Sequence, residues 1–136
     1  MERRSIDDRV NDSRRSNGLA KSIINSKDIK PLEIDGLFGG QGKFLRFPMY
    51  NDADAPPFTV IAETEMEPGS SIGMHTQTDQ QELLYLLAGN GQITIDGETT
   101  QVGKGDAILA RAGCSFSLQN TGHDPIRYLV VKCRLC

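Results

Sequence analysis

The sequence lacks several features that would assign it to common functional classes. It has no apolar run approaching the length of a membrane span, and its first ten residues, MERRSIDDRV, lack the apolar stretch of a secretory signal. The formal net charge is −3, so no excess of positive charge favours a nucleic acid or an acidic membrane surface. We therefore expect a cytoplasmic protein that binds neither a nucleic acid nor a membrane.

Cysteine is also scarce. The chain has three cysteines, an odd number, and only one C-x-x-C spacing, between Cys133 and Cys136. This pattern argues against a disulfide framework or a zinc ribbon, and favours reduced thiols. A chain of 136 residues is long enough to bury about two thirds of its extended surface, so folding requires neither a disulfide nor a structural metal.

The first thirty residues differ from the rest in charge and in apolar content. They carry eight Lys or Arg against five acids, whereas residues 31–136 carry seven against thirteen. The stretch before about Asn25 has few sizeable apolar residues and cannot bury much surface by itself. We expect residues 1–30 to form a polar N-terminal arm, either solvated or packed on a partner surface, and residues 31–136 to form one domain.

From Asp28 onward the sequence is a series of short candidate strands separated by Gly, Pro, Asn and Asp. The pair Asp96-Gly97 predicts a type I′ hairpin, because that turn needs positive φ at both central residues. Ten strands without a long helix predict an all-β sandwich or closed barrel. The ten candidates are residues 28–35, 42–50, 57–67, 72–77, 81–89, 91–96, 98–102, 106–111, 114–120 and 125–136.

Two stretches carry glycines and polar residues at a distinctive spacing. Residues 69–89 read GSSIGMHTQTDQQELLYLLAG, with His75, Gln77 and Glu82 between two glycines, and residues 105–120 read GDAILARAGCSFSLQN. This spacing resembles the two signatures of the cupin superfamily. The resemblance implies a single-domain jelly-roll β-barrel over roughly residues 35–135, with the motif residues inside it.

The sequence departs from the cupin signatures at three positions. Gln77 stands where cupins have a second His, Arg111 replaces a Pro, and Phe116 replaces a metal-binding His. The resemblance implies that His75, Gln77 and Glu82 hold one divalent metal. An imidazole, an amide and a carboxylate form a donor set that suits Fe, Mn, Ni, Co or Zn. The alternative is a metal-free polar cluster in which Gln77 hydrogen-bonds its two neighbours.

Strand alternation indicates which side chains share the interior with Glu82. If Glu82 faces inward, Leu84 does so too. An apolar stripe of Leu83, Tyr85 and Leu87 then faces outward, and we expect a second subunit in a homodimer, or the arm, to cover it. On the last strand we expect the set of apolar and thiol side chains to face inward, which includes Leu129, Val131, Cys133 and Leu135.

Four residues are predicted to contact a small-molecule substrate. Leu84, Phe116 and Cys133 follow from the alternation above. Arg46, flanked by apolar neighbours, could pair with a substrate carboxylate, although it could also face outward. The second histidine, His123, lies in the sequence NTGHDP, which is typical of a surface turn.

The candidate catalytic residues are His75 and Glu82, an imidazole and a carboxylate that can exchange protons in a dry pocket. Iron oxygenases normally rely on two or three imidazoles, and this barrel offers one. The sequence therefore favours a non-redox enzyme, an isomerase, cyclase or lyase, using a divalent metal, acid–base chemistry or both. A mononuclear iron dioxygenase and a ligand-binding cupin without turnover are the alternatives.

Overall fold

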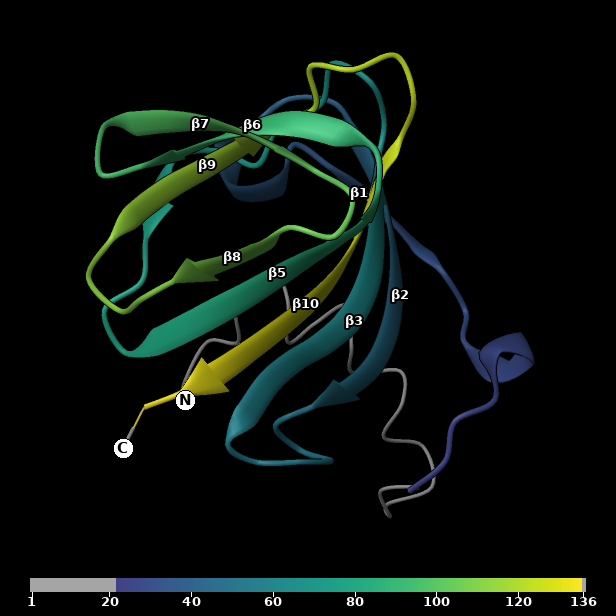
Figure 1. Cartoon of the computed structure of the whole chain (residues 1–136). Helices are drawn as coiled ribbons and strands as arrows, with labels where there is room; N and C mark the ends of the chain where they lie inside the picture. Colours follow the sequence, from purple (N-terminus) through teal and green to yellow (C-terminus); the bar gives the residue numbers. More distant parts are fainter. Residues whose placement is uncertain (1–21, 136) are drawn as a thin grey trace.

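Two antiparallel β-sheets face each other in the computed structural model, which describes residues 22–135 (Figure 1). One sheet has six strands in the order β1-β2-β3-β10-β5-β8, and the other has four in the order β4-β9-β6-β7. This arrangement confirms the predicted all-β jelly-roll fold. The strands are β1 Leu32–Asp35, β2 Lys43–Asn51, β3 Phe58–Met66, β4 His75–Thr76, β5 Gln80–Ala88, β6 Asn90–Ile95, β7 Glu98–Gly103, β8 Ala107–Ala110, β9 Ser115–Gln119 and β10 Ile126–Arg134.

Residues 22–30 precede the first strand and include one 3-10 turn, η2, at Ser26–Asp28. The rest of the predicted arm, residues 1–21, lies outside the described residues. Across residues 22–135, no helix has the length and apolarity needed to cross a membrane.

Each of the ten predicted strands occurs. The hairpin between β6 and β7 turns at Asp96 and Gly97, whose φ angles of 46° and 85° are both positive, as a type I′ turn requires. The largest differences are β1 and β4, each four residues shorter than expected: β1 contains four residues instead of eight, and β4 contains two instead of six. The backbone before β4 pairs with a loop on one side, since Ser71 N donates to Gln41 O and Gly73 N donates to Leu37 O, and with β9 on the other, since Ile72 N donates to Leu118 O.

The inner face of the large sheet consists of side chains in register across its strands. One row has a charged centre, Val60–Lys132–Glu82–Ala110, and the next is apolar, Ala62–Val130–Leu84–Ile108. A third row is Arg46–Thr64–Tyr128–Leu86. All of these residues are buried.

The last strand, β10, presents the opposite face from the one expected. Tyr128, Val130 and Lys132 are buried, whereas Leu129 and Cys133 alternate with them and are partly exposed. The prediction that Cys133 lines the interior is therefore wrong. The apolar residues of β10 that were expected to face inward lie on the outer surface, where they pack beside apolar residues of β5. Leu129 pairs with Tyr85, and Val131 pairs with Leu83.

The end of the barrel distant from the charged row is closed by apolar side chains. Phe44, Met66 and Ile126 are each at most 1% exposed there. Asn120, the last residue of the second motif, holds the loops of this end, because its side-chain Nδ2 donates to Met66 O at 3.1 Å and to Asp124 O at 3.0 Å.

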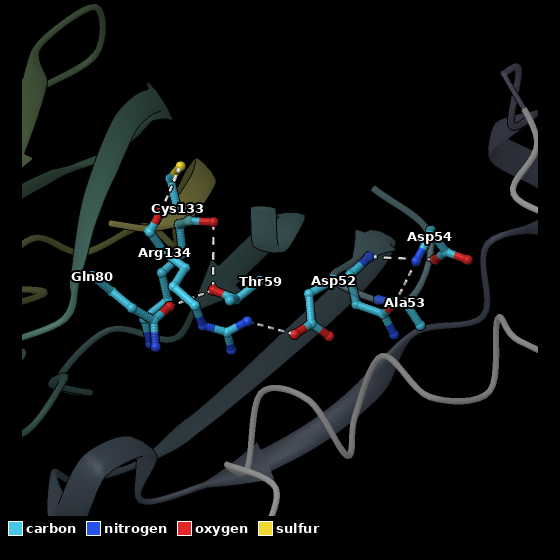
Figure 2. A network of polar contacts seen from close by, with 9 residues as sticks. Asp52, Ala53, Asp54, Thr59, Gln80, Cys133 and Arg134 are labelled. Carbon is cyan, nitrogen blue, oxygen red and sulfur yellow. Dashed lines mark hydrogen bonds and ion pairs between the residues drawn. The ribbon is translucent and has the colours of Figure 1, made fainter. Parts of the chain in front are cut away.

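Polar contacts fix the strand ends beside the charged row (Figure 2). Arg134 Nη1 pairs with Asp52 Oδ2 at 3.0 Å, and Thr59 Oγ1 donates to Gln80 Oε1. These contacts join the loop between β2 and β3 to the end of β10, and the start of β3 to the start of β5. The two strands that carry Glu82 and Lys132 are thus held together near those residues.

Candidate functional site

The candidate site lies where the charged row of the large sheet faces the short strand β4. Glu82 on β5 is 6% exposed and pairs directly with Lys132 on β10, which is 5% exposed. From the other sheet, β4 places His75 opposite Phe116 of β9. The site therefore combines residues from both sheets of the barrel.

The imidazole of His75 has a fixed orientation. Its Nδ1 lies 2.7 Å from Gly73 O, a carbonyl oxygen that can only accept, so Nδ1 carries the proton. In the neutral ring this leaves a lone pair on Nε2. Nε2 is buried and has no hydrogen-bond partner among residues 22–135.

Gln77 is oriented by Glu82 in a similar way. Gln77 Nε2 donates to Glu82 Oε1 at 2.8 Å, which assigns the nitrogen of the amide to the carboxylate side. The amide oxygen, Oε1, is buried and has no partner within the described part of the chain. Two buried acceptors without donors cost about 1–3 kcal/mol each, so the site is incomplete without a cation or a donor group.

Phe38 completes one wall of the site, although nothing in the sequence motifs pointed to it. It belongs to the 3-10 turn η3 (Leu37–Gly39), and its ring stacks on His75 with centroids 4.0 Å apart and an interplanar angle of 11°. Its φ of 51° lies in the left-handed region, which is unusual for a residue other than glycine. The cluster of glycines around it was the only signal in the sequence.

Two glycines allow the Phe38 loop to dock beside β4. A Cβ atom at Gly73 would lie 2.0 Å from Phe38 O, and one at Gly40 would lie 2.0 Å from Ser71 O. Gly73 also donates its N–H to Leu37 O and accepts the His75 Nδ1 proton on its own carbonyl. A single glycine thus positions both the imidazole and the loop whose aromatic ring covers it.

Lys132 is the second site residue that sequence reasoning missed. Its Nζ lies over the Phe38 ring, 5.0 Å from the centroid, a cation–π distance. The sequence predicts Lys132 on the outer face of β10, because the residues that alternate with it, Leu129, Val131, Cys133 and Leu135, are all apolar or thiol.

The structure brings together most, but not all, of the predicted residues. Leu84 is fully buried on the inner face, one row from Glu82, and Phe116 is 1% exposed with its ring centroid 4.5 Å from that of His75. Arg46 is inside the barrel, 2% exposed, and its Nε donates to Thr64 Oγ1 at 3.2 Å. The row that contains Arg46 lies four residues further along the strands than the row of Glu82, a separation of about 13 Å. Arg46 is therefore not part of the His75 cluster.

The remaining polar residues of the motifs lie elsewhere. His123 is exposed, in the turn before β10. Arg111 is exposed beside a cavity of about 410 Å³ that Cys114 and the β6–β7 hairpin also line. None of the metal-ligand candidates lines that cavity.

The donor set of the site fits a divalent metal ion. His75 Nε2 and Gln77 Oε1 are buried lone-pair donors without partners, and Glu82 adds a carboxylate. The Nδ1 contact of His75 with a carbonyl is the type of hydrogen bond that fixes the tautomer of metal-binding histidines. Among residues 22–135 there is no cluster of three His, Cys, Asp or Glu, so any metal site here depends on the amide of Gln77.

Known proteins resemble this chain in sequence and in structure. The family model described as the cupin domain matches residues 62–132. An oxalate-binding protein of Thermotoga maritima is 28% identical over 110 residues, which are 80% of this chain and 91% of that protein. The crystal structure of a predicted oxalate decarboxylase from Thermotoga maritima superposes with a TM-score of 0.79 at 28% identity, covering 83% of this chain and 99% of that one.

A more distant structural neighbour is the polyketide cyclase RemF from Streptomyces resistomycificus. It has a TM-score of 0.68 at 23% identity and covers 83% of this chain and 79% of its own. This likeness concerns the fold alone.

Proposed function

This chain belongs to the cupin family, and from that premise we propose that it is a small-molecule enzyme that carries out a non-redox reaction inside its barrel. The proposed reaction class is isomerisation, cyclisation or elimination. His75, Gln77 and Glu82 would hold one divalent metal, and His75 and Glu82 are the proposed catalytic residues.

One observation carries the proposal. His75 Nε2 and Gln77 Oε1 are both buried and both lack a donor among residues 22–135, next to the Glu82 carboxyl group. Unsatisfied acceptors are rare in protein interiors and concentrate at sites that a ligand or an ion completes. A structural polar cluster would instead satisfy its acceptors internally.

The metal would supply Lewis acidity toward a carbonyl or hydroxyl oxygen of the substrate. The protein supplies the rest. Gly73 holds the His75 ring in one tautomer, and Gln77 holds one Glu82 oxygen at 2.8 Å. The second oxygen of Glu82 is then the proposed proton acceptor, and the rings of Phe38 and Phe116 exclude water around the reacting atoms.

The ligand set favours proton transfer over oxygen activation. The site contains a single imidazole, since His123 is exposed and distant in the fold. Iron oxygenases normally use two or three imidazoles, so a dioxygenase would have to work with an amide in place of one of them. Isomerases, cyclases and lyases need only a polarised oxygen and a positioned base.

Metal content tests the proposal directly. Protein purified without chelator should contain about one first-row divalent ion per chain, and His75→Ala should lose most of it, because the substitution removes the only imidazole donor of the site. His123→Ala is the matched control, because it removes the other, exposed histidine and should retain the ion. Metal that persists in His75→Ala at full stoichiometry would refute the site.

A ligand-binding protein without turnover is the second candidate. It is favoured by the similarity to a Thermotoga maritima protein that is named for binding oxalate. The two candidates differ in one measurement: an enzyme releases a changed product, whereas a binding protein returns the ligand unchanged after prolonged incubation.

A further inference from the structure

The two acceptors that a ligand would contact are closed off from solvent. His75 Nε2 and Gln77 Oε1 are both buried, and neither has a hydrogen-bond partner among residues 22–135. A metal ion or a substrate atom can reach them only when a group that covers them moves aside. One of the side chains around the imidazole must therefore open the site.

Two aromatic rings contact the His75 imidazole, and they differ in their freedom to move. Phe116 is 1% exposed and lies on β9, between β4 and β6, so the barrel encloses its ring. Phe38 is partly exposed and belongs to a loop, and its ring stacks on the imidazole with centroids 4.0 Å apart. Of the two rings, only that of Phe38 has room to move toward solvent.

The backbone beneath the Phe38 ring is fixed, so the movement is confined to the side chain. Gly73 N donates to Leu37 O at 3.0 Å, and a Cβ atom at Gly73 would lie 2.0 Å from Phe38 O. The ring itself is held by its stack on His75 and by the ammonium group of Lys132, 5.0 Å from its centroid. Rotation about the side-chain bonds breaks these contacts without unfolding the loop.

The backbone angle of Phe38 also directs attention to its side chain. Its φ of 51° lies in the left-handed region, which only glycine adopts without a steric cost. The same turn has glycine at two other left-handed positions, Gly36 and Gly39, with φ angles of 68° and 78°. Phe38 carries a phenyl ring despite this cost, and such strain is typical of functional positions.

We propose that Phe38 is the gate of the site: its ring swings away from His75 to admit a ligand to Nε2 and to Gln77 Oε1, and swings back to enclose it. This inference rests on the proposed function in taking those two atoms as the ones that the ligand contacts. It adds a gating residue from outside both sequence motifs, and a conformational step that precedes the chemistry.

The first experiment measures access to His75 in metal-free protein. Diethyl pyrocarbonate acylates the unprotonated nitrogen of an imidazole, and mass spectrometry of the peptides gives the rate for each histidine. The chain has two histidines, so the exposed His123 is an internal reference. We expect His75 to react at least about 10-fold more slowly than His123 in wild type, and Phe38→Ala to speed the reaction of His75 alone by at least about 10-fold. Equal rates at His75 in wild type and Phe38→Ala would overturn the gate.

The second experiment follows the entry and exit of an ion. A gate changes the rates in both directions and leaves the bound and free states unchanged. Phe38→Ala should therefore speed both the uptake of Zn²⁺ and its release to a chelator by at least about 10-fold in stopped flow, with Kd within about 3-fold of wild type. A changed Kd with an unchanged uptake rate would make Phe38 a positioning residue for His75 and would overturn the gate.

Two further variants separate the gate from a general loosening of the fold. Phe47→Ala is the matched control, because Phe47 is also a partly buried phenylalanine but lies on the outer face of β2, beside Met49. It should leave both measurements within about 2-fold of wild type. Phe38→Tyr keeps the ring and should keep the slow rates. If Phe38→Ala does not fold, Phe38→Leu takes its place, and an unchanged reactivity of His75 in that variant would overturn the gate.

The outcomes also separate the gate from the proposed function. Faster acylation of His75 in Phe38→Ala, in a protein that binds no metal, would support the gate and refute the metal site. Metal that is lost in His75→Ala, together with equal acylation rates in wild type and Phe38→Ala, would support the metal site and refute the gate.

Discussion

The two ends of the barrel interior are lined by the same strands but differ in chemistry. At one end, Phe44, Met66 and Ile126 form a closed apolar core with almost no exposure. At the other, β5 and β10 contribute Glu82 and Lys132 instead, and His75 faces them from β4. Alternation along a strand sets which side chains point inward at both ends. The comparison shows that the same inward-facing positions hold charged and polar groups at one end of the barrel and a closed apolar core at the other.

The largest expected effect comes from truncating one aromatic or apolar side chain at each end. Phe116→Ala and Met66→Ala should each cost about 2–5 kcal/mol of unfolding free energy, because both side chains are fully buried. Urea denaturation measures this cost. Only Phe116→Ala should also change which ligands bind, since its ring lies 4.5 Å from that of His75.

Phe58→Ala controls for the loss of a phenyl ring. Phe58 is 37% exposed, so its truncation should cost less than about 1 kcal/mol. If Phe116→Ala leaves both stability and ligand selectivity unchanged, the proposal that Phe116 lines the ligand site at the polar end of the barrel is contradicted.

A smaller effect is expected from strengthening the polar end. Gln77→His replaces an amide oxygen by an imidazole nitrogen, a better donor to late first-row metals, and should tighten binding of Zn or Ni by about 10-fold. Competition with a chromophoric chelator measures the affinity. Gln92→His is the control, since Gln92 lies on β6 outside the site. Weaker metal binding by Gln77→His would show that the amide contributes through its hydrogen bond to Glu82 rather than as a ligand.

Substitutions on the outer face of the six-stranded sheet should have the smallest effect on the barrel interior. Leu83 pairs with both Leu109 and Val131 there, and Tyr85 is 40% exposed. We propose that a second copy of the chain covers this stripe in a homodimer. Leu109→Glu should then yield a monomer by light scattering, with metal content unchanged, whereas Lys104→Glu on the exposed β7–β8 turn should not.

A shortened chain beginning at Lys27 separates the subunit interface from the arm. A dimer that persists in this chain assigns the outer stripe to the second subunit. A monomer in both the full and the shortened chain, at concentrations of tens of micromolar, would contradict the proposal.

The fold could be predicted from the sequence because its signals are local. Strand alternation, turn residues and the Asp96-Gly97 hairpin each depend on neighbouring residues. The inward face of β5 follows from the cupin resemblance, which implies that Glu82 lies inside the barrel. The inward face of β10 could not be predicted in the same way, since both faces of that strand are largely apolar. Only pairing with β5, which places Lys132 opposite Glu82, decides it.

Phe38 shows a different limit. No periodic pattern includes it, because it lies in a 3-10 turn with a left-handed backbone. Its place beside His75 depends on the contact of Gly40 and Gly73 with a distant segment. Close packing of two loops is a tertiary property, which a single sequence read segment by segment does not contain.

The short strand β4 has a consequence for how binding can be detected. It contains two residues and lies at the edge of its sheet, paired only with β9. Such a segment opens locally at a lower free energy than the central strands, so its amide hydrogens should exchange with deuterated solvent early. An ion held jointly by His75 and Glu82 would link this edge to the large sheet. Slower exchange in the peptide around His75, with little change in β3 or β10, would then report occupancy before the chemical identity of the ligand is known.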